Sequence, residues 1–463
     1  MEERFDVIVL GGGPAGSTVA TLLASRGQRV VVVEKDHFPR FHIGESLLPA
    51  SVGIFNRLGV HQQIREHFIL KPGGKWLYGA DEVPGDFSKS DRHAGFKDHP
   101  YSYLVERSVF DKILIDRSSE VGADVRFGTE AVDLIHDGDR VVGVSCLDEN
   151  GTHSELYGRL IVDATGLRAT IPSKLRLRQV TQPHRMGIYA QYAARPTRSD
   201  VQQGWFIGQM FYDGWTWLLN LPGDRFSVGV VLGVDRFRRS CLSPEQLLER
   251  MVDENPLLNE GMTPDRKRIS DVMVTGNMGS TSTALSGEGW VAVGDAAFFI
   301  DPCYSSGVHL ALKSAETVSD IILGLPGEQP VPRRAFAGYE SEMRQHESAV
   351  HRMVDAFYIA TRNTSVQKLV TSLHGGYLTR KFVTFVGGDF DKNAGYIRML
   401  WHVAGIWARL FGNRSDRTPQ THPEYLHAGH TSVMAPVSEK IRRDRTQRRL
   451  PHGAVTDRGE TGV

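Results

Sequence analysis

The sequence predicts an α/β fold with two domains, and three observations carry this prediction. A glycine-rich turn at 11–16 lies between a buried strand at 5–10 and a helical pattern, as at the start of a Rossmann-type dinucleotide-binding unit. Two more short apolar strands close on glycine turns much later, at 160–166 and 290–295. Between them, residues 178–269 alternate apolar and polar side chains, which is typical of an antiparallel sheet.

The glycine-rich turn has residue types that suit a dinucleotide. Gly11 permits the tight turn, Gly13 lets the backbone approach a pyrophosphate, and Gly16 lets the helix pack close to the strand. The next strand, 29–33, ends at Glu34, whose carboxylate can accept hydrogen bonds from a ribose. A plain turn would explain the glycines alone, but the complete series favours a nucleotide site. The predicted contacts here are Gly11, Gly13, Pro14, Ala15, Gly16 and Glu34.

A second turn, at 294–309, has the composition of an anion or cofactor site. It places Asp295, a proline-fixed turn and the small residues Ser306 and Gly307 just before a helical pattern that resumes at Val308. Backbone amides at such a helix start can be presented to an anion or to the polar edge of a flat cofactor.

Composition argues against several classes of partner. The 54 basic residues balance 54 acidic ones, so no net charge draws the chain to nucleic acid or to an anionic membrane. The three cysteines have neither disulfide nor metal-ligand spacing, and we see no signal peptide or membrane-spanning run. We therefore expect a cytoplasmic protein without a metal site. Arginine clusters at 236–239 and 442–449 are expected on solvated surfaces, with docking of an acidic carrier protein as the lesser alternative.

The expected domains are discontinuous along the chain. The nucleotide-binding unit comprises 1–75, 104–177 and 270–340, and a β-sheet domain over a substrate cavity comprises 76–103 and 178–269. Residues 341–412 read as a helical, aromatic region, and 413–463 as a polar tail that is partly disordered.

Further segments indicate FAD as the nucleotide. The strands at 160–166 and 290–295 should converge on the carboxyl edge of one sheet, where ligands of such folds bind. Together with the segment 103–111, they resemble the FAD-dependent monooxygenase superfamily and its two-domain fold over most of residues 1–345. By that resemblance Arg107 approaches FAD and Asp295 binds its ribityl or pyrophosphate region. A surface position at a helix start is the alternative for Arg107.

Three segments narrow the resemblance to the flavin-dependent halogenases: 39–46, 70–79 and 213–222, taken with the turn at 294–309. In that family, oxygen and halide become hypohalous acid at reduced FAD, and the acid travels through a tunnel to a lysine beside the aromatic substrate. The resemblance implies Lys71 as this lysine, Ser306 and Gly307 as the halide site, and Arg40 and Ile43 as further cofactor contacts.

A catalytic role for Lys71 requires a lowered pKa. An apolar tunnel mouth beside Trp76 would desolvate the amine and lower its pKa towards neutrality. Without the surrounding pattern, a solvated lysine at a strand end would be the simpler interpretation. Lys75 is the competitor, because an extended segment would place it on the same face as Lys71, but the family pattern has a non-basic residue there.

Trp215 and Trp217 alternate along a predicted strand and would most often be core aromatics. In the halogenase interpretation they line the tunnel and keep a bulky substrate away from FAD. The family pattern continues with an Ile-Pro pair shortly after the second tryptophan, whereas this chain has Leu219 and Asn220 there, with Pro222 two residues late. That departure gives weight to a hydroxylase.

Tyr304 indicates the substrate class. In halogenases of free tryptophan a glutamate precedes the two small residues of the turn, whereas an aromatic residue resembles the branch acting on phenols and pyrroles, often tethered to a carrier protein. Glu45 and His309 are candidates for a general base that deprotonates a phenol. His42 is expected to have a structural or flavin-contacting role.

The sequence leaves three functions open. The first is a halogenase of an electron-rich aromatic that receives FADH2 from a separate flavin reductase, because no second nucleotide-binding glycine motif is present. The second is an FAD-dependent monooxygenase or reductase that uses NAD(P)H directly. The third is a non-catalytic flavin-binding protein, against which Lys71 and the paired tryptophans argue.

Overall fold

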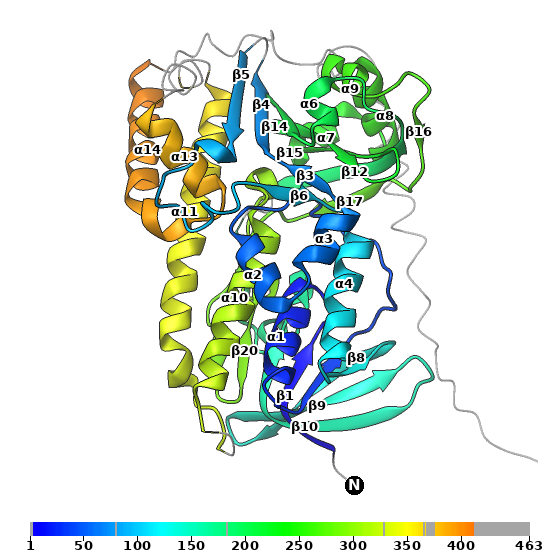
Figure 1. Ribbon diagram of the computed structural model, residues 1–463, viewed down its shortest axis with the longest axis vertical. Coiled ribbons are helices and arrows are strands. Elements are labelled where there is room, and N and C mark those ends of the chain that lie inside the picture. The colour runs from blue at the N-terminus through cyan, green and yellow to red at the C-terminus, as the bar shows by residue number, and fades with distance from the viewer. Residues whose placement is uncertain are drawn as a thin grey trace, which may run out of the picture.

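Parallel strands form the centre of the first sheet, which lies in the lower half of Figure 1. The computed structural model describes residues 3–78, 81–181, 184–326, 329–363, 366 and 376–411. β1 (Glu3–Leu10) pairs in parallel with β2 (Val30–Val33) and β10 (His153–Asp163), and β10 pairs with β20 (Trp290–Ala292). The sheet also contains β7 (Asp124–Arg126), β8 (Thr129–Asp137), β9 (Arg140–Asp148) and β19 (Ser286–Gly287). Burial on both faces explains why its central strands are continuously apolar.

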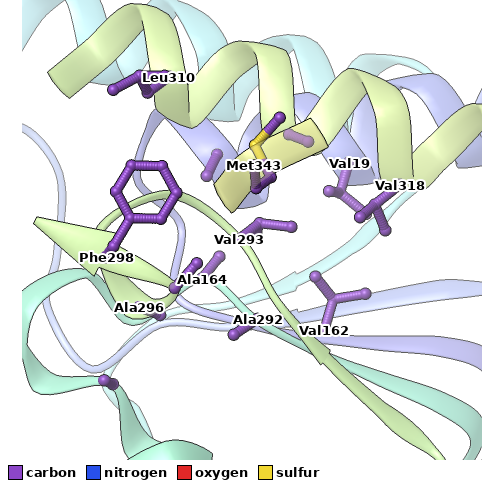
Figure 2. Close-up of a cluster of buried hydrophobic side chains, with 14 of the residues drawn as sticks. Val19, Val162, Ala164, Ala292, Val293, Ala296, Phe298, Leu310, Val318 and Met343 are labelled. Carbon is purple, nitrogen blue, oxygen red and sulfur yellow. The ribbon is translucent and has the colours of Figure 1, made fainter. Parts of the chain in front are cut away.

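Three helices pack together beside this sheet. α1 (Pro14–Ala24) follows β1 and contacts both α4 (Arg107–Glu120) and α10 (Ser306–Leu323). Figure 2 shows the apolar core that they share with the strands, in which Val162 and Ala292 lie with Val318 of α10 and Met343 of α11 (Ala337–Arg362). The small Ala164, Ala292 and Ala296 let the backbone approach closely, so α10 is held tightly over the strand ends.

The second sheet, in the upper half of Figure 1, is almost entirely antiparallel. Only β13 and β4 pair in parallel among its described strands. Most of its strands lie within 178–269, so the antiparallel sheet expected there from the alternation of apolar and polar side chains is confirmed. In sheet order the strands are β16 (Lys267–Arg268), β12 (Arg185–Ala193), β15 (Arg225–Gly233), β14 (Gly214–Leu221), β13 (Phe206–Phe211), β4 (Gly73–Tyr78) and β5 (Asp81–Asp86), with β17 (Met273–Gly276) also on β12.

The boundaries between the two units differ from the expected ones. β17 lies beyond the predicted boundary at residue 270, yet it pairs with β12 of the second sheet. β4 begins at Gly73, before the predicted boundary at residue 75. Conversely, β11 (Arg178–Val180) pairs with β18 (Ser280–Ser282) outside the second sheet. The boundaries between the two units are set by which strands pair, and no local sequence pattern reveals this pairing.

The last three described helices of the chain form a packed group. α11, α13 (Tyr377–Val386) and α14 (Phe390–Phe411) pack together, which confirms the helical region within its described residues. The predicted tail at 413–463, with the arginines at 442–449, lies outside the described residues, whereas 236–239 belongs to α7 (Val234–Ser240). The other helices are α2 (Ser51–Leu58), α3 (His61–His67), α5 (Thr170–Lys174), α6 (Ser199–Gln202), α8 (Pro244–Glu254) and α9 (Pro256–Gly261).

A separate pair of short strands carries the predicted catalytic lysine. β3 (Ile69–Lys71) pairs with β6 (Ser102–Leu104) and belongs to neither large sheet. The remaining short elements are β21 (Phe298–Phe299) and the 3-10 turns η1 (Phe87–Lys89), η2 (Gly166–Arg168), η3 (Gly294–Ala296), η4 (Pro302–Tyr304) and η5 (Arg333–Phe336). Within the described ranges, no helix has the length and apolar character to cross a membrane. The same residues hold no cluster of His, Cys, Asp and Glu placed to bind a metal.

Candidate active site

A cavity of about 540 Å³ runs from the ends of β1 and β2 to the tryptophans of β14. Its wall contains most of the predicted cofactor contacts, which come from distant parts of the sequence. These are Gly11, Gly13, Pro14, Ala15, Glu34, Arg40, Ile43, Arg107 and Asp295, together with Gly307, Trp215 and Trp217 from the other predicted groups. The cavity therefore joins the predicted nucleotide site to the predicted tunnel wall.

Gly11, Gly13 and Gly16 have different surroundings, and of these three Gly13 leaves room for a phosphate. A Cβ on Gly11, whose φ is +97°, would lie 2.5 Å from the carbonyl oxygen of Ala164. A Cβ on Gly16 would lie 1.9 Å from the carbonyl oxygen of Gly11, so Gly16 serves helix packing and does not line the cavity. A Cβ on Gly13 would meet only Arg40, at 3.6 Å. Gly13 thus has the open backbone that a pyrophosphate requires.

Charged groups around this turn suit the phosphate and ribose of FAD. The buried Glu34 accepts a hydrogen bond from the Gly12 amide (2.7 Å). Arg40 lies 3.9 Å from Glu34 and 3.8 Å from Asp111, and its buried Nε has no hydrogen-bond partner among the described residues. A buried donor without a partner is costly, and a phosphate or ribose oxygen would satisfy it. The residues present therefore fit FAD.

Arg107 is buried at the start of α4 and is not a surface residue. Its guanidinium donates to both oxygens of Asp111 (2.7 and 2.9 Å) and to the carbonyl oxygen of Ile43 (2.7 Å). The predicted position beside FAD agrees with its place in the cavity wall, where it also holds the loop at Ile43. His42, on the same loop, also lines the cavity.

The turn after β20 places the Asp295 carboxyl group at the cavity and ends at Ser305, which has a left-handed backbone conformation. Burial raises the pKa of Asp295 to about 6, while Arg107 and Arg178 act to lower it. Ser305, directly before α10, has a left-handed φ of +58°, a conformation that costs free energy for a residue other than glycine. Ser306 and Gly307 then form the first turn of α10, where backbone amides lack partners within the helix. Gly307 lines the cavity, whereas the Ser306 side chain is buried elsewhere.

Lys71 is buried and lies just behind the cavity wall. Its Nζ donates to Ser46 Oγ (2.8 Å) and to the Leu47 carbonyl oxygen (2.9 Å), and lies 5.2 Å from the ring centre of Phe87. Burial lowers the pKa of Lys71 to about 7. Ser46 itself lines the cavity and also accepts a hydrogen bond from Ser305 Oγ (3.0 Å). A chain of two hydroxyl groups therefore connects the lysine to the turn before α10.

Lys75 differs from Lys71 in every respect that matters for catalysis. Pro72 separates β3 from β4, so the two lysines lie in different sheets and not on one extended face. Lys75 forms ion pairs with Glu82 (2.8 Å) and Asp200 (3.2 Å), and the hydrogen bonds to these carboxylates raise its pKa against the opposing effect of burial. Lys75 is thus a permanently charged structural residue.

The predicted tryptophans form a continuous aromatic wall. The ring centres of Trp215 and Trp217 are 5.4 Å apart, and both rings line the cavity. Trp217 Nε1 donates to Ser227 Oγ (3.0 Å). Trp76 does not line the cavity but packs behind the wall, 5.6 Å from Trp215. Leu219, where the sequence departs from the family pattern, also lines the cavity.

Tyr304 lies in a different place from the one expected for a residue of the flavin turn. Its ring packs against Phe357 of α11 (5.8 Å) and Phe382 of α13 (6.3 Å), outside the lining of the described cavity. Because η4 ends at Tyr304, its ring turns towards the C-terminal helices while Ser305 turns towards the cavity. Burial holds the pKa of Tyr304 well above its ordinary value, so its phenol stays protonated.

Only one of the two candidate general bases lies at the cavity. Glu45 lines it, accepts a hydrogen bond from Gln191 Nε2 (2.8 Å), and has its pKa raised to about 7 by burial. His309 lies 3.2 Å from Ser51 Oγ and is not part of the lining. The sequence reasoning missed Ser46, although it stands next to Glu45 in a segment that carried the resemblance.

Several known proteins similar to this chain are halogenases. The FAD binding domain family matches residues 4–353. A tryptophan 2-halogenase of Chondromyces crocatus is 33% identical over 334 residues, which span 69% of this chain but only 62% of that protein. A 1H-pyrrole-2-carbonyl peptidyl-carrier protein chlorinase of Pseudomonas fluorescens is 27% identical over 383 residues, covering 77% of this chain and 84% of that protein.

A solved structure with a similar fold is also a halogenase. The myxobacterial chondrochloren halogenase CndH, a variant of FAD-dependent halogenases, has a TM-score of 0.71 and 29% identity to this chain, over 87% of it and 97% of CndH. The flavin-dependent halogenase armH3 of Armillaria mellea is 30% identical over 349 residues, which cover 69% of this chain and 68% of that protein. The chain therefore belongs to the FAD binding domain family and, within it, to the flavin-dependent halogenases.

Proposed function

We propose that this protein halogenates an electron-rich aromatic compound, using FADH2, oxygen and chloride or bromide. The observation that carries the proposal is Lys71, a buried amine with a pKa near 7 that is one hydroxyl group away from the FAD cavity. A protein that only bound FAD would gain nothing from burying this amine, which costs free energy. Bound FAD, when reduced, supplies the electrons with which oxygen and halide become hypohalous acid.

The protein's own residues would hold the halide and keep the substrate apart from FAD. The backbone amides at Ser306 and Gly307 are the proposed halide site, because the start of α10 favours an anion. Trp215 and Trp217 line the cavity, and their proposed role is to keep a bulky ring away from FAD while a small acid passes. This separation favours halide oxidation over direct hydroxylation.

Lys71 would then act on the oxidant. At neutral pH a large fraction of its amine is uncharged, and the uncharged form can take the halogen from hypohalous acid. The charged form can instead donate a hydrogen bond to the acid. Glu45 exchanges a proton in the same pH range at the cavity wall, so it is the better of the two candidate bases.

For the substrate we propose a phenol or a pyrrole, either free or tethered to a carrier protein. Tyr304 stands where tryptophan halogenases have a glutamate, and its buried phenol cannot replace that carboxylate. One relative in the same family is a halogenase of tryptophan and another acts on a carrier-bound pyrrole, so overall similarity does not select between substrates. A separate flavin reductase is the proposed source of FADH2.

A hydroxylase that uses NAD(P)H is the second candidate, and Leu219 favours it. The family pattern has an Ile-Pro pair near this point of the wall, whereas here β14 continues unbroken to Leu221, and Leu219 lines the cavity. A differently shaped wall could admit a substrate to the flavin.

The two candidates are separated by one assay. The protein receives FADH2 from a flavin reductase, with oxygen and either bromide, chloride or neither, and a scavenger traps hypohalous acid. The halogenase proposal predicts trapped acid only with halide, and halogenated product once a phenol or a pyrrolyl-carrier thioester is added. Hydroxylated product without halide, or no trapped acid at all, would contradict it.

A further inference from the structure

A buried polar chain behind the cavity wall, reaching it at Trp215, joins three elements of the fold. The Tyr358 hydroxyl of α11 donates to Asp301 Oδ2 over 2.6 Å and accepts a hydrogen bond from Trp215 Nε1 over 3.3 Å. Asp301 directly precedes Pro302 in the turn that leads to α10, and Trp215 belongs to β14. Tyr358 therefore connects the flavin turn to the tryptophan wall.

The direction of these hydrogen bonds is fixed by the chemistry of the groups. Asp301 is 0% exposed, and its other oxygen accepts a hydrogen bond from the Cys303 amide (3.1 Å), with the Cys303 thiol also bonded to this carboxyl. A carboxyl in such a place needs donors, and burial keeps the pKa of Tyr358 well above its ordinary value, so the phenol retains its proton. Tyr358 donates to Asp301, and its oxygen lone pairs accept the hydrogen bond of the Trp215 indole.

The tyrosine ring is held as firmly as its hydroxyl. The Arg185 guanidinium lies 3.3 Å from the centre of the Tyr358 ring and donates to Asp213 Oδ1 over 3.0 Å. Asp213 has a left-handed φ of +61° in the turn that begins β14. The same strand is thus attached to α11 just before its start through Asp213 and two residues later through Trp215.

We propose that Tyr358 is a positioning residue that fixes the Trp215 indole in the cavity wall and thereby sets the share of flavin oxidation that ends in halogenated product rather than in hydrogen peroxide. This inference rests on the proposed halogenase function. Trp215 is 2% exposed and contacts both Trp217 and Trp76, so a rotation of its indole would disturb the entire wall. A disturbed wall no longer separates the oxidant from water or directs it to Lys71.

Tyr358→Phe tests the proposal, with Tyr339→Phe as the matched control. Tyr339 lies in the same helix, is equally buried, and also donates one hydrogen bond, to the Ala292 carbonyl oxygen (2.6 Å), but does not touch the wall. We expect the ratio of halogenated product to peroxide to fall roughly three- to tenfold in Tyr358→Phe. The ratio should stay unchanged in Tyr339→Phe, and FAD affinity should stay unchanged in both. An unchanged ratio in Tyr358→Phe, or an equal loss in both variants, would overturn the proposal.

A double-mutant cycle shows whether Tyr358 acts through Trp215. Trp215→Phe removes the indole donor, so adding Tyr358→Phe to it should cause little further loss of the product ratio. If the two losses multiply, Tyr358 acts by another route and the proposal fails.

A measurement without halide separates this proposal from the function on which it rests. In protein labelled with 5-fluorotryptophan, the fluorine resonance of Trp215 is assigned by its loss in Trp215→Phe. It should shift and broaden in Tyr358→Phe and remain in place in Tyr339→Phe. No change in Tyr358→Phe would refute the positioning role, whereas a wild-type protein that makes no hypohalous acid would refute only the halogenase function.

Discussion

The FAD cavity and the pocket of Lys71 lie on opposite sides of Ser46, and they differ in whether their cationic side chains have carboxylate partners. In the cavity, Arg107 and Asp111 form a buried bidentate ion pair, and Arg40 lies near Glu34. Lys71 has no carboxylate partner among the described residues and contacts two neutral oxygens and two aromatic rings. The arginines of the first region therefore have carboxylate partners, whereas burial without such a partner favours loss of the proton from Lys71.

The same difference in carboxylate partners distinguishes Lys71 from Lys75, four residues further along the chain. Lys75 has two carboxylate partners and stays charged, while Lys71 has none and titrates near neutral pH. The surroundings of each amine, and not its residue type, decide which of them can react with an oxidant.

The largest expected effect comes from removing the unpaired amine. Lys71→Ala should lower halogenation by at least about 100-fold, because no other described group near Ser46 can pass the halogen on. Oxidation of FADH2 and release of peroxide should continue at the wild-type rate. Product and peroxide are measured in parallel, with Lys75→Ala as the control that retains halogenation. Full halogenation by Lys71→Ala would remove Lys71 from the mechanism.

The cavity side is tested by Gly13→Val. Gly13 has a φ of −71°, which any residue can adopt, and an added Cβ meets only Arg40 at 3.6 Å. The variant should therefore fold with a nearly unchanged melting temperature but bind FAD at least about tenfold more weakly, because the new side chain occupies the place of the pyrophosphate. Fluorescence titration with FAD measures the affinity. Wild-type affinity would show that the phosphate lies elsewhere.

The uncompensated lysine should also affect stability in a pH-dependent way. Between about pH 7 and its ordinary pKa of 10.5, Lys71 is protonated in the unfolded chain and not in the folded one, so stability rises with pH across this window. Lys71→Met should therefore be more stable than wild type at low pH, by about 1 kcal/mol or more. The difference should narrow as the pH approaches 10.5. Urea unfolding at several pH values measures it, and a constant difference would mean that Lys71 does not titrate as inferred.

The smallest effect is expected at the hydroxyl between the two regions. Ser46→Ala removes one of two acceptors for Lys71 Nζ and the partner of Ser305, so halogenation should fall roughly three- to tenfold. Ser46→Thr keeps the hydroxyl and should retain most of the activity. Equal losses in both variants would point to a steric cause.

The part of the site that depends on local chain geometry could be predicted from the sequence. Gly11, Gly13 and Glu34 follow one another within a single strand, turn, helix and strand, and the structure keeps that order. The resemblance also singled out Lys71, whose burial among Phe87 and Phe206 no local pattern could reveal.

The parts of the site that depend on contacts between distant segments could be seen only in the tertiary structure. The orientation of Tyr304 depends on Phe357 and Phe382, which lie on helices more than fifty residues away in the chain. The bond between Asp301 and Tyr358 likewise joins segments that share no local pattern. Pairing across such distances decides which side of a turn faces the cavity, and a single sequence contains no signal for it.

The strand break at Pro72 has a consequence for making new variants of this protein. Lys71 ends β3, which is fastened only to β6, whereas the second sheet begins at Gly73. The lysine is therefore held by a strand pair outside the second sheet, while that sheet supplies the tryptophan wall of the cavity. Exchanging that sheet with the corresponding part of a relative would change the cavity wall, and with it which molecules reach the amine, while leaving the strand pair that carries Lys71 intact.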